Sequence, residues 1–362
     1  MVVNRMDANS YNIDGHKLNL HPERVSRWLR GESIYPIYME FSPSGTCNHR
    51  CVFCSMDFMG YKKRFLDADV VCRRLRECGE LGVRSVMFAG EGEPLLHKEI
   101  CRMAQAASEA GIDVAFTTNG VLLDEERAAR LLPITSWIKV SCNAATEEEY
   151  ARVHRTAPED FSRAIHNIER AAAIRARNGY ACTLGFQCIL LPEYADNMPK
   201  LARRAREAGA DYLVVKPYTH SPLSLHNPFG DIQYGDYAEL EAALRAEESD
   251  DFRIIFRREA MQRWNDKKAA FDRCLALPFW AYVDSGANVW GCLRHLKEDD
   301  FLYGNLNEQP FSEIWQGEKR LSAVRRCEEG LDISECHVTC RMELVNNYLW
   351  RLRHPHPHDN FI

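Results

Sequence analysis

Three cysteines lie close together near the start of the chain, at Cys47, Cys51 and Cys54. The chain has 14 cysteines in 362 residues, so this spacing is expected by chance only about 0.02 times. Three thiolates on one loop are one ligand short of a closed zinc site. They suit a [4Fe–4S] cluster in which the fourth iron stays open for another ligand. The spacing therefore predicts a reactive iron–sulfur site.

A second group of cysteines lies between residues 270 and 345, and 17 residues separate the first two of them. Several thiols in so short a region predict a second metal centre, and a structural zinc site is the alternative to an iron–sulfur cluster. A cluster held entirely by protein ligands would serve electron transfer or structure. The expected ligands are Cys274, Cys292, Cys336 and Cys340, with Cys327 as the alternative ligand.

Short β-branched or aromatic runs alternate with longer segments of helical period from residue 36 onward. Six such strands, the first five each followed by a helix, predict a parallel sheet with right-handed crossovers. Six units are too few for a closed eight-stranded barrel, so we expect an α/β fold with a partial (β/α)6 TIM-like barrel and chemistry at the strands' C-terminal ends. The predicted strands are Ile37–Phe41, Ser85–Phe88, Val114–Thr117, Trp137–Ser141, Thr183–Leu191 and Tyr212–Lys216.

The sequence pattern divides the chain into five parts. Residues 1–35 form an N-terminal extension and residues 36–220 the barrel. Residues 221–269 read as a loop followed by a linker helix, because Pro, Gly, Asn and His dominate their first part. A small cysteine-bearing iron–sulfur domain covers 270–345, and a His- and Pro-containing tail covers 346–362.

The composition excludes several classes of protein. Apolar residues make up 46% and charged residues 27% of the chain, which is typical of a globular protein and not of a disordered one. A net charge of −6 argues against a nucleic-acid partner. No apolar run is long enough to span a membrane, and the first residues lack the pattern of a secretory signal. We therefore expect a cytoplasmic protein with reduced thiols.

The CxxxCxxC motif at the end of the first predicted strand resembles that of the radical S-adenosylmethionine (SAM) superfamily. The resemblance covers residues 36–220 and extends to the ends of strands two to four, where glycine-rich and small polar segments occur. It implies that SAM binds an open iron of the cluster and is cleaved to a 5′-deoxyadenosyl radical. The implied cofactor-binding residues are Phe53, Gly90, Gly92, Glu93, Asn119, Ser141 and Asn143, with Arg152 or Arg155 for the SAM carboxylate.

The second cysteine group resembles the SPASM/twitch extension of radical SAM enzymes. The full SPASM pattern has seven cysteines, but here Gly330 stands where one is expected and no cysteine follows Cys340. The resemblance therefore implies one auxiliary [4Fe–4S] cluster beside the SAM-binding [4Fe–4S] cluster and SAM. It also implies an electron donor such as flavodoxin or ferredoxin.

Radical SAM enzymes with one auxiliary cluster include 2-deoxy-scyllo-inosamine dehydrogenase-like members. The resemblance therefore implies a radical SAM oxidoreductase that acts on a sugar or aminocyclitol carbinol in antibiotic or carbohydrate biosynthesis. Dehydrogenation and epimerisation are both open. Peptide crosslinking or epimerisation is the alternative, weakened because only some 35 residues precede the first strand. Candidate catalytic residues are Cys142 and Cys188 as hydrogen donors, although strand parity turns Cys188 away from the mouth, and Lys216, Tyr218, His220 and His226 as substrate contacts or bases.

Overall fold

The computed structural model describes residues 11, 15–219, 221–336 and 339–361. One ten-stranded sheet organises them, with the strand order β10-β9-β8-β1-β2-β3-β4-β5-β6-β7. The strands are β1 (Tyr38–Phe41), β2 (Ser85–Phe88), β3 (Asp113–Thr118), β4 (Thr135–Ser141), β5 (Thr183–Ile189), β6 (Tyr212–Lys216), β7 (Arg253–Phe256), β8 (Trp280–Val283), β9 (Asn288–Trp290) and β10 (Leu302–Asn305).

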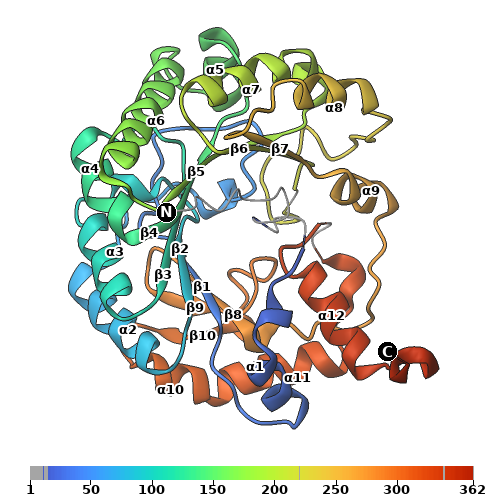
Figure 1. Cartoon of the computed structure of the whole chain (residues 1–362). Coiled ribbons are helices and arrows are strands. Elements are labelled where there is room, and N and C mark those ends of the chain that lie inside the picture. The colour runs from blue at the N-terminus through green and yellow to red at the C-terminus, as the bar shows by residue number, and fades with distance from the viewer. Residues whose placement is uncertain (1–10, 12–14, 220, 337–338, 362) are drawn as a thin grey trace.

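Helices cover the outer side of the curved sheet, as Figure 1 shows for α2 to α8. The C-terminal helices, coloured orange to red, lie on the side of β8 to β10. The helices are α1 (Pro22–Leu29), α2 (Ala68–Glu80), α3 (Ile100–Glu109), α4 (Glu125–Leu131), α5 (Glu147–His154), α6 (Glu159–Asn178), α7 (Met198–Glu207), α8 (Ala238–Arg245), α9 (Arg258–Asp266), α10 (Phe311–Gln316), α11 (Glu318–Glu329) and α12 (Glu343–Arg353). Among the described residues, none of these helices has the length and apolar character needed to cross a membrane.

The partial TIM-like barrel predicted from the sequence is confirmed, but its parallel sheet is larger than six strands. β7 pairs parallel to β6, and β8 pairs parallel to β1 at the opposite side of the original six. In the described part of the chain β7 pairs only with β6, so the barrel stays open. The sequence analysis missed β7 because it interpreted residues 221–269 as a loop followed by a linker helix.

Residues 284–286 lie in the turn of a hairpin formed by the antiparallel pair β8 and β9. Asp284 shapes its turn, because its Oδ1 accepts the backbone N–H groups of Gly286 (2.7 Å) and Asn288 (3.1 Å). Its Oδ2 accepts the indole N–H of Trp290 at 2.9 Å. Since β8 also pairs with β1, the cysteine-rich C-terminal region continues the sheet of the barrel.

Alternate residues along the parallel strands face opposite sides, which determines the side chains inside the barrel. The outward set is apolar and wholly buried beneath the helices, as parallel strands require; examples are Phe41, Phe88, Phe116, Val140 and Phe186. The inward set carries polar and charged groups near the strands' C-terminal ends; it includes Glu40, Thr117, Lys139, Gln187 and Lys216. The barrel interior is therefore the chemically equipped side of the sheet.

Candidate active site

Three thiols meet on the loop that joins β1 to α2. Burial raises the pKa of Cys47 to about 12, and the nearby Glu93 and Cys54 add to the effect. Burial also holds the pKa of Cys51 well above its usual range, with further contributions from Cys54 and Cys47. The sulfurs therefore lie close enough to repel one another as thiolates. A cationic iron cluster would relieve that repulsion, so the donor set fits a cluster held by three cysteines.

His154, the last residue of α5, lies against this thiol group with its Nδ1 3.2 Å from the sulfur of Cys51. Its other ring nitrogen, Nε2, accepts the backbone N–H of Asn143 at 3.1 Å. Burial lowers the pKa of His154 well below its usual range, so the ring is neutral and its proton is on Nδ1, directed at the sulfur. The sequence did not predict this residue, because nothing in α5 indicates that its end packs on the cysteine loop.

Glu93 organises the ends of β2 and β3. Its buried carboxylate accepts hydrogen bonds from the hydroxyl of Thr118 (2.6 Å) and the backbone N–H of Asn119 (2.8 Å). The side chain of Asn119 in turn donates to Asn48, inside the cysteine loop, at 2.7 Å. The sequence assigned Glu93 and Asn119 to cofactor contact. The structure brings both beside the cysteine loop, with the Glu93 carboxylate engaged in positioning neighbouring strand ends.

The glycines between Ala89 and Pro94 let the backbone pass directly against the cysteine loop. A Cβ on Gly92 would lie 2.0 Å from the carbonyl oxygen of Thr46, and one on Gly90, which has φ +104°, would lie 2.4 Å from Ser42. Only glycine fits such a close approach. The close approach at these glycines is therefore to the protein's own cysteine loop.

The five C-terminal cysteines form a second thiol group. Cys327 and Cys274 are hydrogen-bonded to each other, and this contact lowers the pKa of Cys274 below its usual value. Burial raises the pKa of Cys292 well above its usual range, and Cys340, Cys274 and Cys336 add to the effect. All five sulfurs therefore share one site. Cys327, which the sequence placed second as a ligand, directly contacts one of the four preferred ligands.

A cavity of about 900 Å³ extends from the second thiol group to the residues that directly follow the first one. All five cysteines of the second group line it, and Ser55 and Met56, directly after Cys54, line it from the first loop. Met87, Thr117, Lys139, Gln187 and Lys216 line its barrel side. A molecule bound in this cavity would contact the second thiol group and the residues that follow Cys54.

Two family models match the chain. Residues 41–205 match the radical SAM superfamily, and residues 274–341 match the SPASM iron–sulfur cluster-binding domain. The chain carries a radical SAM domain followed by a SPASM domain. The first match contains the CxxxCxxC thiols, and the second contains all five thiols of the C-terminal group.

Known proteins with similar sequences or folds agree with these two domains. A probable GTP 3′,8-cyclase of Methanopyrus kandleri is 32% identical over 202 residues, covering 55% of this chain and 59% of that protein. The chain spans less than two thirds of the length of the curated relatives it matches. SuiB of Streptococcus suis, solved with S-adenosylmethionine, has a similar fold with a TM-score of 0.62 at 18% identity, covering 88% of this chain and 74% of SuiB. The enzyme anSMEcpe with bound AdoMet has a TM-score of 0.56 at 16% identity, covering 86% of this chain and 88% of that one.

Residues 41–205 and 274–341 of this chain thus form a radical SAM domain and a SPASM domain. A radical SAM domain binds a [4Fe–4S] cluster and SAM, and a SPASM domain binds auxiliary iron–sulfur clusters. The two thiol groups are the cysteine sets that fit these cofactors, one on each domain.

The other predicted SAM-site residues of the radical SAM domain take different positions. Phe53 lies edge-on to the ring of His154 at 5.5 Å, beside the cysteine loop. Ser141 is half-buried at the end of β4, and the buried Asn143 accepts the backbone N–H of Ile189 at 2.6 Å. These three side chains therefore lie around the first thiol group or at the adjoining strand ends.

The two candidate arginines lie at the exposed end of α5. Arg152 stacks on the ring of Tyr194 at 5.3 Å and donates to its hydroxyl at 3.3 Å. Arg155 follows α5 in the left-handed conformation with φ +47°. Both side chains are exposed, and neither lines the cavity. The structure gives no contact between either arginine and the thiol group.

Cys142 and Cys188, predicted as hydrogen donors, lie away from the cavity. Both are buried in the core beneath the helices, and neither lines the cavity. Gln187, the strand neighbour of Cys188, faces the cavity instead, as the alternation of side chains on β5 requires. The Cys142 thiol donates to the carbonyl of Ala144 at 3.5 Å. These thiols belong to the packing of the radical SAM domain.

Lys216, the last residue of β6, lines the cavity as predicted for a substrate contact or base. Burial lowers its pKa to about 7, and the positive charges of Lys139 and Arg257 add to the effect. Tyr218 has a different environment: its ring lies between those of Phe229 and Trp264, at 5.7 and 5.6 Å, and burial raises its pKa to about 12. The amine of Lys216 is therefore the better base.

The loop after β6 is anchored to the cysteine loop by Asp57. Its Oδ1 accepts the hydroxyl of Ser224 and the backbone N–H of Leu225, both at 2.9 Å. His226, proposed from the sequence as a substrate contact or base, has its Nδ1 3.2 Å from Asp57 Oδ2 and does not line the cavity. His220 lies outside the described residues. The contacts of His226 thus hold the loop in place.

Proposed function

We propose that this radical SAM enzyme is an oxidoreductase that converts a carbinol of a sugar or an aminocyclitol into a ketone. The observation that carries the proposal is the placement of Lys216 and the five C-terminal cysteines in one cavity. A dehydrogenation needs a base for the hydroxyl proton and an acceptor for an electron. The cavity offers Lys216 for the first and a group of thiols that would hold an electron-accepting cluster for the second.

The first thiol group, Cys47, Cys51 and Cys54, would hold the SAM-binding cluster. Cys274, Cys292, Cys336 and Cys340 would hold the auxiliary cluster, with Cys327 as the alternative ligand. When bound, the first cluster and SAM supply a 5′-deoxyadenosyl radical that takes a hydrogen atom from the carbinol carbon, and the auxiliary cluster accepts the remaining electron. A one-electron donor such as flavodoxin or ferredoxin is the proposed partner.

Lys216 supplies the base in this proposal. Its Nζ takes the proton from the carbinol oxygen while the carbon loses a hydrogen atom, so that two protons and two electrons leave and a C=O bond forms. A pKa of about 7 makes a large share of the amine neutral near neutral pH, which is the condition for an effective general base. Lys216 therefore fits the role of general base both by its position in the cavity and by its lowered pKa.

The positions of the thiols favour dehydrogenation over epimerisation. An epimerase must return a hydrogen atom from the opposite face of the substrate, for which a thiol in the cavity is needed. Cys142 and Cys188, the candidates for that role, point into the core. The thiols that do line the cavity are those of the SPASM group.

Peptide modification is the second candidate function. SuiB, which has a similar fold, has been solved with its precursor peptide SuiA, and that structure covers 85% of this chain with a TM-score of 0.62. A peptide substrate would make contact with Lys216 unnecessary for turnover. The two functions therefore differ in their dependence on this residue.

The proposal is tested by anaerobic incubation of the cluster-loaded protein with SAM, a reductant and a panel of polyols and amino sugars. We expect a ketone to form together with 5′-deoxyadenosine from at least one hydroxylated compound. Formation of 5′-deoxyadenosine without any carbonyl product across the panel, and with product from a peptide, would favour the second candidate.

A further inference from the structure

The cavity carries positive charge in a protein that is negative overall. The chain has 46 Lys and Arg against 52 Asp and Glu, a net charge of −6. The residues lining the cavity include eight Lys and Arg against four Asp and Glu. A concave site with charge opposite to that of its protein indicates a ligand of complementary charge.

Part of this positive charge has partners or neighbours inside the protein. Arg341 forms an ion pair with Glu40, and Arg263 lies 3.3 Å from Glu343. Arg294 lies 3.7 Å from Glu298 and follows Cys292 by two residues. These arginines line the SPASM side of the cavity, where they would also offset the negative charge of a thiolate-bound cluster. They do not call for an anionic substrate.

Lys139 differs from these arginines. It lies on a barrel strand and faces the cavity, and no carboxylate pairs with it among the described residues. It lies on β4 one inward-facing position before the strand's end, and its Nζ is 5.1 Å from the centre of the Trp137 ring. Burial lowers its pKa to about 8, and Arg257 adds to the effect. The charged neighbour that influences Lys139 is thus another cation.

Lys216 lines the same cavity as Lys139 and lies nearer to the C-terminal ends of the strands. It ends β6, whereas Lys139 lies below the end of β4, and Gln187 on β5 faces the cavity between their strands. Lys139 and Arg257 both lower the pKa of Lys216. Two buried amines near each other repel, and a bound anion would relieve that repulsion. Among the described residues, the Trp137 ring is a favourable contact for the Lys139 charge, but no carboxylate pairs with it.

We infer that the substrate carries an anionic group, a phosphate or a carboxylate, and that Lys139 binds this group inside the barrel. This inference rests on the proposed function and narrows its substrate from sugars in general to acidic, hydroxylated ones. A lysine ammonium binds either anion as a point charge. The anion lies below the level of Lys216, so that the carbinol is held at the mouth beside that amine. A cationic amino sugar is the wrong charge for this cavity.

The test measures binding and not turnover. The cluster-loaded protein, held anaerobically without reductant, is titrated with glucose 6-phosphate, glucuronate, glucose and glucosamine in a calorimeter. At least one of the two acidic sugars is expected to bind about tenfold or more tightly than glucose, since a charge-assisted contact is worth about 1.5–3 kcal/mol. The phosphate and carboxylate arms show which anion is preferred.

Three variants make the assignment specific to Lys139. K139Q is expected to lose the preference for the acidic sugar, and K139R to retain it. K63Q removes an exposed lysine that does not line the cavity and is expected to bind like the wild type. Iron content and melting temperature show that each variant is folded, and rescue by K139R separates binding from a structural role.

Absence of saturable binding by either acidic sugar overturns the inference, as does an acidic-sugar preference that survives in K139Q. Binding of glucosamine as tight as that of the acidic sugars also overturns it. Because no reductant is present, none of these results depends on ketone formation. Failure of the dehydrogenase assay would leave the binding result intact, and the two proposals can therefore fail separately.

Discussion

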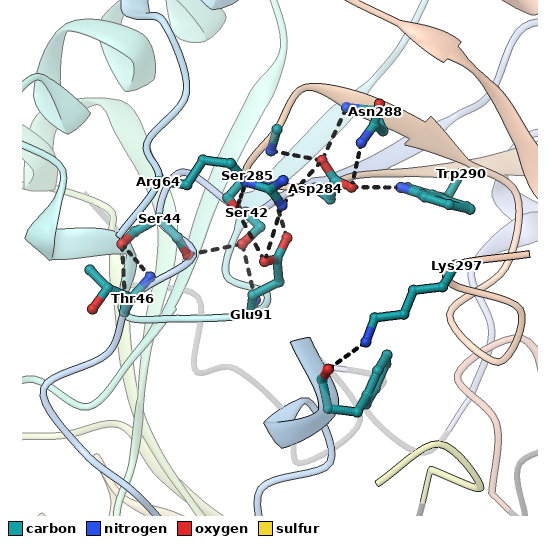
Figure 2. Close-up of polar contacts among 12 residues, drawn as sticks. Ser42, Ser44, Thr46, Arg64, Glu91, Asp284, Ser285, Asn288, Trp290 and Lys297 are labelled. Atoms are coloured by element: carbon teal, nitrogen blue, oxygen red, sulfur yellow. Dashed lines mark hydrogen bonds and ion pairs between the residues drawn. The ribbon is translucent and has the colours of Figure 1, made fainter. Parts of the chain in front are cut away.

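The carboxylate of Glu91 receives both hydrogen-bond donors of Ser285: the backbone N–H at 2.8 Å on Oε1 and the hydroxyl at 3.1 Å on Oε2 (Figure 2). Arg64, from the cysteine loop, donates to the Ser285 hydroxyl at 2.9 Å and lies 3.6 Å from Glu91. Glu91 follows β2 and Ser285 belongs to the turn between β8 and β9. This contact joins the radical SAM domain to the SPASM domain beside the first thiol group.

Replacing Glu91 by Gln tests this connection. The Gln amide has the shape of the Glu91 carboxylate, but its NH2 group donates where a carboxylate oxygen accepted from Ser285. A charged hydrogen bond in a buried site is therefore lost. We expect E91Q to lower the free energy of unfolding by about 1.5–3 kcal/mol and the melting temperature by several degrees. Calorimetry of the cluster-loaded wild type and variant measures both quantities. K63Q, which alters an exposed lysine of the same loop, is the control, and equal melting of all three proteins would contradict the account.

The cysteine spacing and the strand-end motifs were enough to predict the two domains and the mouth of the barrel. Cys47, Cys51 and Cys54 are close in sequence, so their convergence needs only a local loop. The glycines at 90 and 92 likewise indicate that the backbone there has no room for a Cβ atom. Their exact partner, the carbonyl of Thr46, depends on how two loops meet and was beyond the sequence pattern.

His154 is predicted to adjust the reduction potential of the first cluster. Its Nδ1–H donates to the sulfur of Cys51, and a hydrogen bond to a ligand sulfur stabilises the more negative, reduced state. H154F removes the donor while keeping a ring that can stack on Tyr150. We expect the midpoint potential of the SAM-binding cluster to fall by tens of millivolts in an anaerobic titration followed by electron paramagnetic resonance. An unchanged potential in a variant of full iron content would remove this role.

The rate of ketone formation should depend on the protonation of Lys216. Its pKa is lowered to about 7 by burial, Lys139 and Arg257. The protonated amine cannot accept a proton, so the rate should rise with pH through about 7 and level off above it. K216R, which stays protonated, should lose ketone formation by on the order of 100-fold while still forming 5′-deoxyadenosine. A pH-independent rate, or an active K216R, would exclude Lys216 as the base.

Cys142 and Cys188 should be dispensable for turnover. Both thiols are buried away from the cavity, so C142A and C188A should keep the wild-type product while losing about 1 kcal/mol of stability through lost packing. Product analysis after a single turnover checks this. An abortive or unsaturated product in either variant would restore the hydrogen-donor role that the sequence indicated.

What the sequence could not supply are the relationships made by tertiary packing. The direction of a side chain beyond the end of a strand, as for Cys142, follows from the turn that the chain takes there. His154 reaches Cys51 only because α5 folds back on the cysteine loop. Lys139 falls within the predicted strand Trp137–Ser141, but its distance from carboxylates depends on how distant parts of the chain pack around it.

The central claim is that the two thiol groups have separate tasks around one cavity. Its most direct test is the product analysis of anaerobic reactions by the wild type, C54A and C292A with an oxidisable substrate. The account predicts 5′-deoxyadenosine and ketone from the wild type, 5′-deoxyadenosine with little ketone from C292A, and neither from C54A. Undiminished ketone formation by C292A, or cleavage of SAM by C54A, would contradict it.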